Sequence, residues 1–253
     1  MIATGLKPIA YTLRTEDGKH LYTIEGYEYE LESVTTNLRV INRPGINDWR
    51  EKLGKDEATR LRDEGGEIGR MVHKAGLRLF KGEGYGTYEW SQLGYPTPGD
   101  ERVRNAVRAL DLLRKERNLV PAAAEIFVYS IGDGGAGTAD AAIWVDDTHS
   151  AVDIYDWKTS DRVYPEVWLQ LAPYAKWFME CYGIPVRRVY PVRLDRGLPN
   201  AKSALYELGQ RYETKDGPVH IEFMEGDDIM LAFDTYMRAQ ELGRWIQEHG
   251  GRY

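Results

Sequence analysis

The stretch Gly137-Thr138-Ala139-Asp140, followed sixteen positions after its aspartate by Asp156-Trp157-Lys158-Thr159-Ser160, decides the fold of this chain. Residues 141–145 are apolar and β-prone, residues 146–150 are polar and turn-forming, and residues 151–158 are again apolar and β-prone. These patterns predict a β-hairpin with a short turn.

The predicted hairpin also indicates where its charged side chains point. Because side chains alternate along a strand, Asp156 and Lys158 share a face with Ile154, while the two aromatic residues between them point to the other face. Pairing across the turn brings Asp140 alongside Asp156 and Lys158. The sequence therefore predicts two carboxylates and one ammonium group that converge among apolar neighbours.

Converging carboxylates indicate a bound cation. Two facing carboxylates raise the pKa of one of them unless a cation lies between them. Magnesium or manganese suits carboxylate oxygens, polarises a phosphoryl oxygen and lowers the pKa of a bound water, and Lys158 would hold or deprotonate that water. The alternative is a surface hairpin with a weak solvated ion pair, and the Asp-x-Lys pattern on its own favours this alternative.

Three motifs together resemble those of one nuclease family. Residues 137–140, residues 156–160 and the segment Gln170-Leu171-Ala172-Pro173-Tyr174 match in order and spacing the G-x-x-D, D-x-K-[ST] and Q-x-x-x-Y motifs of the RecB-like branch of PD-(D/E)xK nucleases. Upstream, Gly69-Arg70-Met71-Val72-His73 resembles the helix that contributes a histidine ligand in this branch. Ser33-Val34-Thr35-Thr36 resembles the opening segment of its single-domain phage and mitochondrial genome-maintenance exonucleases.

The resemblance, which covers roughly residues 30–195, implies a site residue by residue. His73, Asp140 and Asp156 would bind the metal, with the backbone carbonyl of Trp157 as a fourth ligand. Lys158 would be the catalytic lysine. All of these assignments depend on the resemblance.

Further residues follow from the same resemblance. Gln170 and Tyr174, four positions apart on one helix face, would orient the lysine and touch the DNA backbone. Glu125, at the start of an apolar strand, lies where the family often has a glutamate near the metal. The residues expected to contact DNA beside the site are Arg70, Lys74, Thr159 and Ser160.

Each of these residues has a structural alternative. His73 could be an ordinary core or surface histidine, and Glu125 could be a solvated carboxylate at a strand end. Gln170 and Tyr174 could form the polar shoulder of an amphipathic helix. Pro173 departs from the family pattern, and because a proline kinks a helix, it changes the expected reach of Gln170 relative to Tyr174.

Composition agrees with a single core in a reducing cytoplasm. The 253 residues are 42% hydrophobic, enough for a full core, and no apolar run approaches the roughly 20 residues that span a bilayer. The N-terminus lacks a signal-peptide pattern, and Cys181 has no second cysteine for an internal disulfide. One cysteine also excludes a four-cysteine iron–sulfur cluster, and the absence of a phosphate-binding loop motif excludes a helicase motor.

The charge distribution does not single out one DNA-binding surface. A net charge of −7 argues weakly against nonspecific DNA binding, which depends on Lys and Arg. Basic residues nevertheless cluster near the predicted site, on the helix of His73 and after the helix of Gln170, and either cluster could flank a DNA channel or be a solvated surface. The clusters are Arg60, Arg62, Arg70, Lys74, Arg78 and Lys81, and Arg187, Arg188, Arg193 and Arg196.

The pattern along the chain predicts an α/β fold with a mixed central sheet. An accessory β-hairpin with a turn at Glu16-Asp17-Gly18 occupies residues 1–32. An α-β-β-β-α-β restriction-endonuclease-like core occupies residues 33–195, and a strand and helix fill residues 196–253, all within one domain. The predicted core elements are helices over 49–80, 100–117 and 165–182 and strands over 124–131, 138–145, 151–158 and 185–194. Residues 81–98 form a candidate substrate-binding loop. The C-terminal helix, residues 227–249, is expected to pack through Phe233, Met237, Leu242, Trp245 and Ile246.

We therefore expect a magnesium- or manganese-dependent DNA nuclease that hydrolyses phosphodiester bonds. The resemblance favours an exonuclease acting on single-stranded DNA or DNA ends in replication, recombination or repair. The alternatives are a structure-specific or restriction-type endonuclease and a non-catalytic DNA-binding subunit. The expected partners are DNA and recombination or replication proteins, with no membrane, and the expected location is the cytoplasm.

Overall fold

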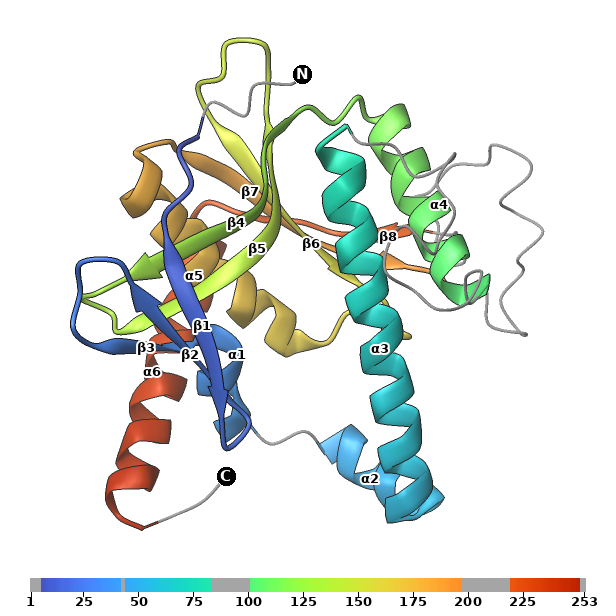
Figure 1. The fold of residues 1–253 in the computed structure, drawn as a ribbon, viewed down its shortest axis with the longest axis vertical. Helices are drawn as coiled ribbons and strands as arrows, with labels where there is room; N and C mark the ends of the chain where they lie inside the picture. The colour runs from blue at the N-terminus through green and yellow to red at the C-terminus, as the bar shows by residue number, and fades with distance from the viewer. Residues whose placement is uncertain (1–5, 42–43, 83–100, 197–218, 251–253) are drawn as a thin grey trace.

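The computed structural model describes residues 6–41, 44–82, 101–196 and 219–250. Its described part is a mixed sheet with helices on both faces (Figure 1). The strands are β1 (Tyr11–Glu16), β2 (Lys19–Ile24), β3 (Glu30–Ser33), β4 (Pro121–Ser130), β5 (Gly135–Trp144), β6 (Val152–Lys158), β7 (Val186–Leu194), β8 (Val219–Ile221) and β9 (Met224–Glu225). The helices are α1 (Val34–Asn37), α2 (Pro44–Leu53), α3 (Lys55–Phe80), α4 (Glu101–Glu116), α5 (Pro165–Tyr182) and α6 (Asp227–Glu248), with a 3-10 turn at Leu38–Val40.

The centre of the sheet has the predicted order of elements. Strands β4, β5 and β6 form an antiparallel meander, and β7 then pairs parallel to β6 after the crossover through α5. Helices α3 and α4 precede this unit. The prediction of an α/β fold with a mixed central sheet and an α-β-β-β-α-β element order is therefore confirmed.

One edge of β5 is shared between two strands. Strand β4 pairs along the whole of the other edge, from Pro121 opposite Ile143 to Ser130 opposite Gly135. On the shared edge, β6 pairs antiparallel with residues 141–144, whereas β3 pairs parallel with residues 135–136. Because a strand has only two edges for hydrogen bonding, the sheet forks here. No described strand pairs with residues 137–140 along this edge, and we call this opening the fork.

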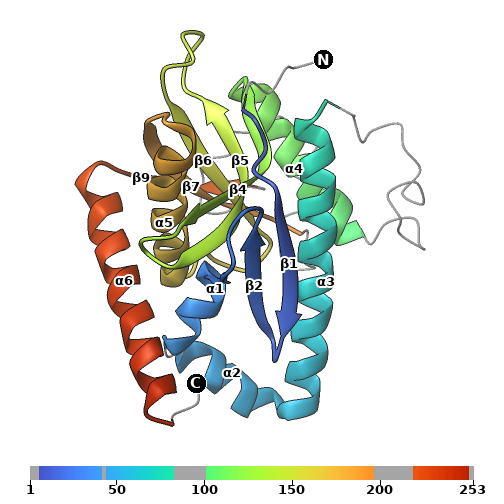
Figure 2. The same ribbon diagram turned by 60° about the vertical axis from the view of Figure 1, so that its left-hand side comes forward.

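Two layers of helices bury the two faces of the sheet. Ile154 packs into the core formed with α5 and α6, whereas Tyr155 and Trp157 pack into the core formed with α3 and α4. Figure 2 shows α5 and α6 together on one side of the strands and α3 on the other. The predicted alternation of side chains along β6 is confirmed.

The N-terminal strands form the predicted hairpin. Strands β1 and β2 pair antiparallel around a tight turn at Asp17 and Gly18, whose φ angles are +48° and +76°. Two consecutive positive φ angles are typical of the hairpin turn that suits the twist of the strands. Strand β3 adds to β2 and links the hairpin to β5.

The break between the first helices lies at Gly54 and not at the three glycines that follow. Gly54 has a φ of +80°, and α3 then runs without interruption through Gly65, Gly66 and Gly69. Each interior glycine costs a helix about 1 kcal/mol relative to alanine. A Cβ on Gly69 would lie 3.5 Å from the hydroxyl of Thr159, so this part of α3 packs against the segment that follows β6.

The C-terminal helix differs from its prediction. Leu242 is 51% exposed and Trp245 is 58% exposed, so the expectation that they face the core is wrong. The buried row near this end of α6 is Tyr236, Gln240 and Gly243. These residues are spaced by four and three positions, which places them on one helix face. The packing of α6 therefore buries the face with Tyr236, Gln240 and Gly243 and leaves Leu242 and Trp245 exposed.

Two other expectations concern the loop over residues 81–98 and the absence of a membrane span. Most of the predicted substrate-binding loop, residues 81–98, lies outside the described residues, which resume at residue 101. No helix within the described ranges combines the length and apolarity needed to cross a bilayer.

The turn between β4 and β5 is tied to α5 through Asp133. Its carboxylate accepts hydrogen bonds from Nε1 of Trp177 at 2.7 Å and from Nζ of Lys176 at 3.1 Å. Partial burial acts to raise the pKa of Asp133, but the hydrogen bonds from Trp177 and Lys176 outweigh it and lower the pKa below its usual value. A carboxyl with a depressed pKa stabilises the fold above its unfolded pKa, and this contribution is lost as the pH falls through the folded pKa.

We predict that Asp133→Asn lowers the free energy of unfolding by about 1 kcal/mol at pH 7, because the variant lacks the negative charge that Trp177 and Lys176 bind. The loss is modest because solvent screens the partly exposed carboxylate. Urea unfolding followed by circular dichroism measures this difference. The difference between native chain and variant should shrink as the pH falls below about 4. Asp234→Asn, at an exposed position of α6, is the matched control. A difference that stays constant down to pH 3 contradicts the prediction.

Candidate active site in the fork of the sheet

Asp140 lies where β5 and β6 separate. Their pairing runs from Trp144 opposite Val152 to Ala141 opposite Tyr155 and ends one position before Asp140 and Asp156. Asp140 uses both carboxylate oxygens in the opening. Its Oδ2 accepts the backbone N–H of Trp157 at 2.6 Å, and its Oδ1 lies 2.6 Å from Nδ1 of His73.

His73 reaches the fork from α3. The helix is anchored by a buried apolar row, and His73 lies beside this row with its ring partly exposed. Burial acts to lower the pKa of His73, but the charge and hydrogen bond of Asp140, together with the charge of Asp156, raise it overall. The negative charge in the fork therefore favours a cation at the position of this imidazole.

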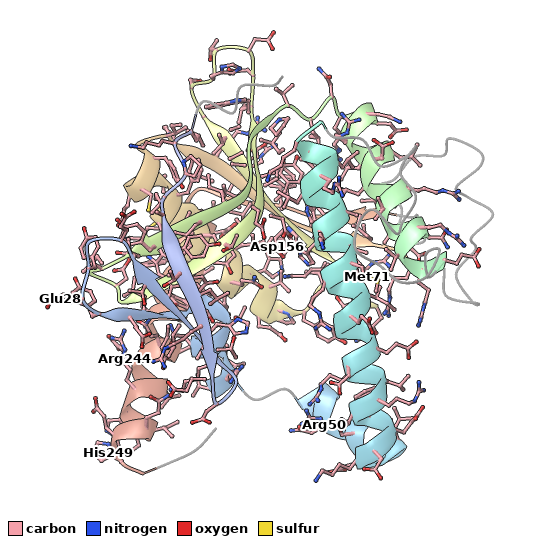
Figure 3. The ribbon with its side chains drawn as sticks, in the orientation of Figure 1. Glu28, Arg50, Met71, Asp156, Arg244 and His249 are labelled. Carbon is pink, nitrogen blue, oxygen red and sulfur yellow. The ribbon has the colours of Figure 1, made fainter. Side chains whose placement is uncertain are left out.

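Asp156 is the most deeply buried acid of the site. Only 2% of this residue is exposed, and Figure 3 shows it near the centre of the molecule. Burial, followed by the charge of Asp140, raises the pKa of Asp156, while Lys158 and His73 act in the opposite direction. The ammonium of Lys158 lies directly against Oδ2 of Asp156, so the two buried charges form an ion pair.

Lys158 is held by a chain of polar side chains from α5. Its Nζ donates to Oε1 of Gln170 at 3.2 Å, and Nε2 of Gln170 donates to the hydroxyl of Tyr174 at 3.2 Å. The same Nε2 lies 3.5 Å from Oδ1 of Asp156. Helix α5 continues through Pro173, so Gln170 and Tyr174 both reach the fork from one helix face.

Gly137 allows Tyr174 to enter the fork. A Cβ on Gly137 would lie 2.9 Å from both Cζ and the hydroxyl oxygen of Tyr174. Real side chains do not approach one another this closely. Tyr174 is buried, and burial together with the charge of Asp156 raises its pKa well above the usual value, so the phenol stays protonated. The glycine of the G-x-x-D motif is therefore required by the tyrosine of the Q-x-x-x-Y motif.

Trp157 contributes its backbone and not its side chain. Its N–H binds Asp140 as described, whereas its indole stacks on Phe80 of α3 with ring centroids 5.2 Å apart. The indole belongs to the core between the sheet and α3.

Glu125 does not join the site. By register it lies opposite Asp140, between the pairs Ala124–Ala141 and Ile126–Ala139. Its φ of +53° departs from the extended backbone of its neighbours, and its side chain is exposed. Among the described residues no hydrogen bond joins Glu125 to His73, Asp140 or Asp156. The prediction of a glutamate at the start of this strand also placed the start too late, because β4 begins at Pro121.

The predicted DNA-contacting residues lie beside the fork in different settings. Arg70 and Lys74 are exposed on α3, three positions before and one position after His73. Thr159 packs against Gly69, whereas Ser160 donates its hydroxyl to the carbonyl of Arg162 at 2.7 Å.

The second basic cluster is divided in two. Arg187 binds the buried Asp153 at 3.0 Å and Arg188 pairs with Glu225, both at the start of β7. Arg193 and Arg196 lie at the opposite end of β7, and Arg193 is in register with Lys158. Only this second pair lies at the end of the sheet that carries the site.

Tyr22 of β2 is a neighbour of the site that the sequence did not indicate. Burial raises the pKa of Tyr22, and its phenol interacts with Thr138 of the G-x-x-D segment. No local pattern could have identified it, because the contact depends on how the hairpin packs on β4 and β5.

The fork contains side chains of the types that bind divalent cations, but they bind one another in this structure. Within the part of the chain that the structure describes, no three His, Cys, Asp or Glu side chains form a ready metal-binding group. His73 and Asp140 bind each other instead, and Asp156 lies against Lys158. The available donors are nevertheless two carboxylates and an imidazole, and Asp156 is almost fully buried. This donor set suits magnesium or manganese.

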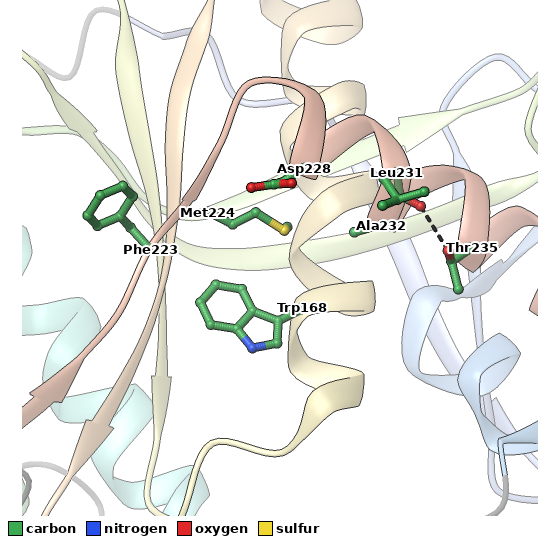
Figure 4. A pocket seen from close by; sticks show the side chains of 7 residues that line it. All are labelled: Trp168, Phe223, Met224, Asp228, Leu231, Ala232 and Thr235. Carbon is green, nitrogen blue, oxygen red and sulfur yellow. Dashed lines mark hydrogen bonds between the residues drawn. The ribbon is translucent and has the colours of Figure 1, made fainter.

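An apolar hollow elsewhere on the molecule does not contain the site. It lies between α5 and the start of α6, and Figure 4 shows Trp168 and Met224 facing Asp228 across it. None of the predicted site residues lines it.

Neither known protein families nor curated proteins provide a match. No family model matches the chain, and no curated protein is similar to it at the level required for a match.

We predict that Gly137→Ala lowers the free energy of unfolding by about 1–3 kcal/mol, because the added methyl group collides with the buried ring of Tyr174. Urea unfolding measures the loss. Gly132→Ala is the matched control, because a Cβ there would meet only the hydroxyl of Ser130 at 4.0 Å. Equal stability of both variants contradicts the contact between Gly137 and Tyr174.

Proposed function

We propose that the chain is a metal-dependent DNA nuclease that hydrolyses phosphodiester bonds with magnesium or manganese. The observation that carries the proposal is the meeting of Asp140, Asp156 and Lys158 at the fork, together with His73 from α3 and Gln170 from α5. These residues come from four separate elements.

The charge balance of the fork supports a metal site. His73, Asp140 and Asp156 would hold the ion, which when bound polarises a phosphoryl oxygen and lowers the pKa of a coordinated water. Two carboxylates in a buried opening repel each other, and burial already raises the pKa of Asp156. A divalent cation relieves this repulsion.

The setting of Lys158 supports a catalytic role. Asp156 and Gln170 restrict its ammonium group, and Tyr174 in turn fixes Gln170. An ammonium group held in this way orients an attacking water and offsets the negative charge that develops on the phosphoryl oxygens. Gln170 and Tyr174 act as positioning residues in this scheme.

The kind of DNA substrate follows from the resemblance to a nuclease family. The motif order supports the RecB-like branch of PD-(D/E)xK nucleases, and its single-domain members favour an exonuclease on single-stranded DNA or DNA ends. A role beside recombination or replication proteins follows from the same resemblance.

We predict that the native chain degrades linear single-stranded DNA when magnesium or manganese is present and not when a chelator is added. Lys158→Ala should reduce the rate by about 100-fold or more, because the variant loses the group that orients the water and offsets charge. A gel assay with matched linear and circular single-stranded DNA measures both effects.

Two variants keep this assay interpretable. Lys115→Ala, an exposed lysine of α4 paired with Asp111, controls for the loss of one positive charge. Lys158→Gln retains an amide donor for Asp156 in case removal of the ammonium unfolds the chain. Cutting of the circle indicates an endonuclease. Cleavage that Lys158→Ala and Lys158→Gln leave unchanged, or no cleavage at all, rejects the proposed catalytic site and favours a non-catalytic DNA-binding subunit.

We predict that manganese stabilises the folded chain. At ten times the dissociation constant, an ion that binds only the folded state adds about 1.4 kcal/mol to the free energy of unfolding. Thermal unfolding with increasing manganese measures the gain, independently of any cleavage.

Asp140→Asn should abolish this gain, because the variant loses one of the two carboxylates that attract the ion. Asp147→Asn, in the exposed turn between β5 and β6, is the matched control and should keep the gain. A manganese effect of the same size in the native chain and in Asp140→Asn contradicts a metal site in the fork.

A further inference from the structure

Arg196 is a partly buried arginine at the end of β7. Its guanidinium lies over α3, where a Cβ on Gly65 would be 3.9 Å from its Nη1. The amide of Asn105 in α4 reaches its backbone carbonyl at 3.5 Å. These two contacts place the end of β7 against α3 and α4.

Among the described residues, the charge of Arg196 has no direct partner. No described residue accepts a hydrogen bond from its guanidinium, and no described carboxylate forms an ion pair with it. An arginine has five N–H donors, and most buried donors are hydrogen-bonded in native proteins. A group with this many free donors and a full positive charge is suited to an anion.

The surrounding charges leave Arg196 incompletely neutralised. Glu64, the nearest acid on α3, binds Arg102 at 2.6 Å and Arg60 at 3.2 Å. Burial lowers the pKa of Arg196, and the positive charge of Arg102 lowers it further, against the opposing charges of Asp161, Asp195 and Glu64. An additional anion would therefore stabilise this position.

Helix α3 sets the distance between Arg196 and the candidate active site. His73, Gly69 and Gly65 lie on successive turns and face Asp140, Thr159 and Arg196, in that order. Eight residues of helix span about 12 Å. Since successive phosphates in one DNA strand are about 3.4 Å apart along the helix axis, and farther apart in a stretched strand, this distance corresponds to about two to four nucleotides.

We propose that Arg196, with Arg102 beside it, forms a phosphate-binding site on α3 that holds the DNA backbone about two to four nucleotides from the bond that is cut. This inference rests on the proposed nuclease function. A guanidinium binds two phosphate oxygens in a planar, bidentate arrangement, so the site fixes the strand without reading its sequence. Thr159 lies between this site and Lys158 along the path of the strand.

Binding without metal tests the site separately from cleavage. The probe is a fluorescein-labelled single-stranded oligonucleotide in chelator, and fluorescence anisotropy over a range of salt concentrations measures its affinity. Arg196→Ala should weaken binding about 10-fold and lower the slope of log affinity against log salt by about 0.7, the value for one phosphate contact on a single strand. Arg196→Lys should keep most of the slope and lose part of the affinity, because lysine retains the charge without the bidentate geometry.

Arg238→Ala, at an exposed position of α6 on the other face of the sheet, is the matched control. It removes the same charge and should leave affinity and slope unchanged. Equal binding by the native chain and Arg196→Ala overturns the inference. An equal loss in Arg196→Ala and Arg238→Ala also overturns it, because the effect is then one of overall charge. Urea unfolding verifies that each variant is folded.

A second measurement locates the phosphate. Methylphosphonate linkages remove the charge of single phosphates, and they are placed one at a time along the oligonucleotide. A neutral linkage at one position, two to four nucleotides from the cut, should slow cleavage by the native chain several-fold and leave Arg196→Ala unaffected. Native cleavage with no such position overturns the inference and leaves the nuclease proposal intact. Specific binding through Arg196 without cleavage rejects the nuclease proposal and leaves the phosphate site intact.

Discussion

The edge of β5 that β6 and β3 share is the constraint on which the rest of the structure depends. A strand can pair on two edges only, and β4 occupies one of them completely. Because β6 takes residues 141–144 of the other edge and β3 takes residues 135–136, residues 137–140 face an opening instead of a described partner strand. Polar side chains fill this opening. Beyond the end of the β5–β6 pairing, the carboxylate of Asp140 accepts the backbone N–H of Trp157. A buried peptide N–H needs such an acceptor.

Burial then makes the contents of the fork interdependent. Removing one partner from a buried charge pair is more destabilising than the pair is stabilising, so loss of either Asp156 or Lys158 would leave the other charge uncompensated. Gln170 and Tyr174 complete the hydrogen bonds of this pair, and Tyr174 reaches it only because residue 137 lacks a side chain. The spacing of the three motifs along the chain is thus a consequence of one packing arrangement. In the proposed function, the same low-dielectric setting would strengthen the attraction between the carboxylates and a metal ion.

Helix α3 connects the proposed chemistry with the proposed strand contact. Its interior glycines are unfavourable for an isolated helix. Gly69 faces Thr159 and Gly65 faces Arg196, at the ends of β6 and β7. His73 follows Gly69 by one turn and faces Asp140. A single helix therefore fixes the separation between the candidate metal ligand His73 and Arg196. The basic residues at the start of β7, Arg187 and Arg188, are engaged in ion pairs at the far end of the sheet and belong to a different surface.

The sequence by itself determined the local order of this protein. Alternation along residues 151–158 placed Asp156 and Tyr155 on opposite faces, and the Asp17–Gly18 turn set the N-terminal hairpin, because both patterns depend on neighbouring residues only. Only the tertiary structure decided which distant groups meet. The pairing of β3 with β5, the contact of His73 with Asp140, the outward position of Glu125 and the exposure of Leu242 and Trp245 all depend on elements far apart in the chain. Local periodicity reports which face of an element is apolar, whereas packing decides which face finds a partner.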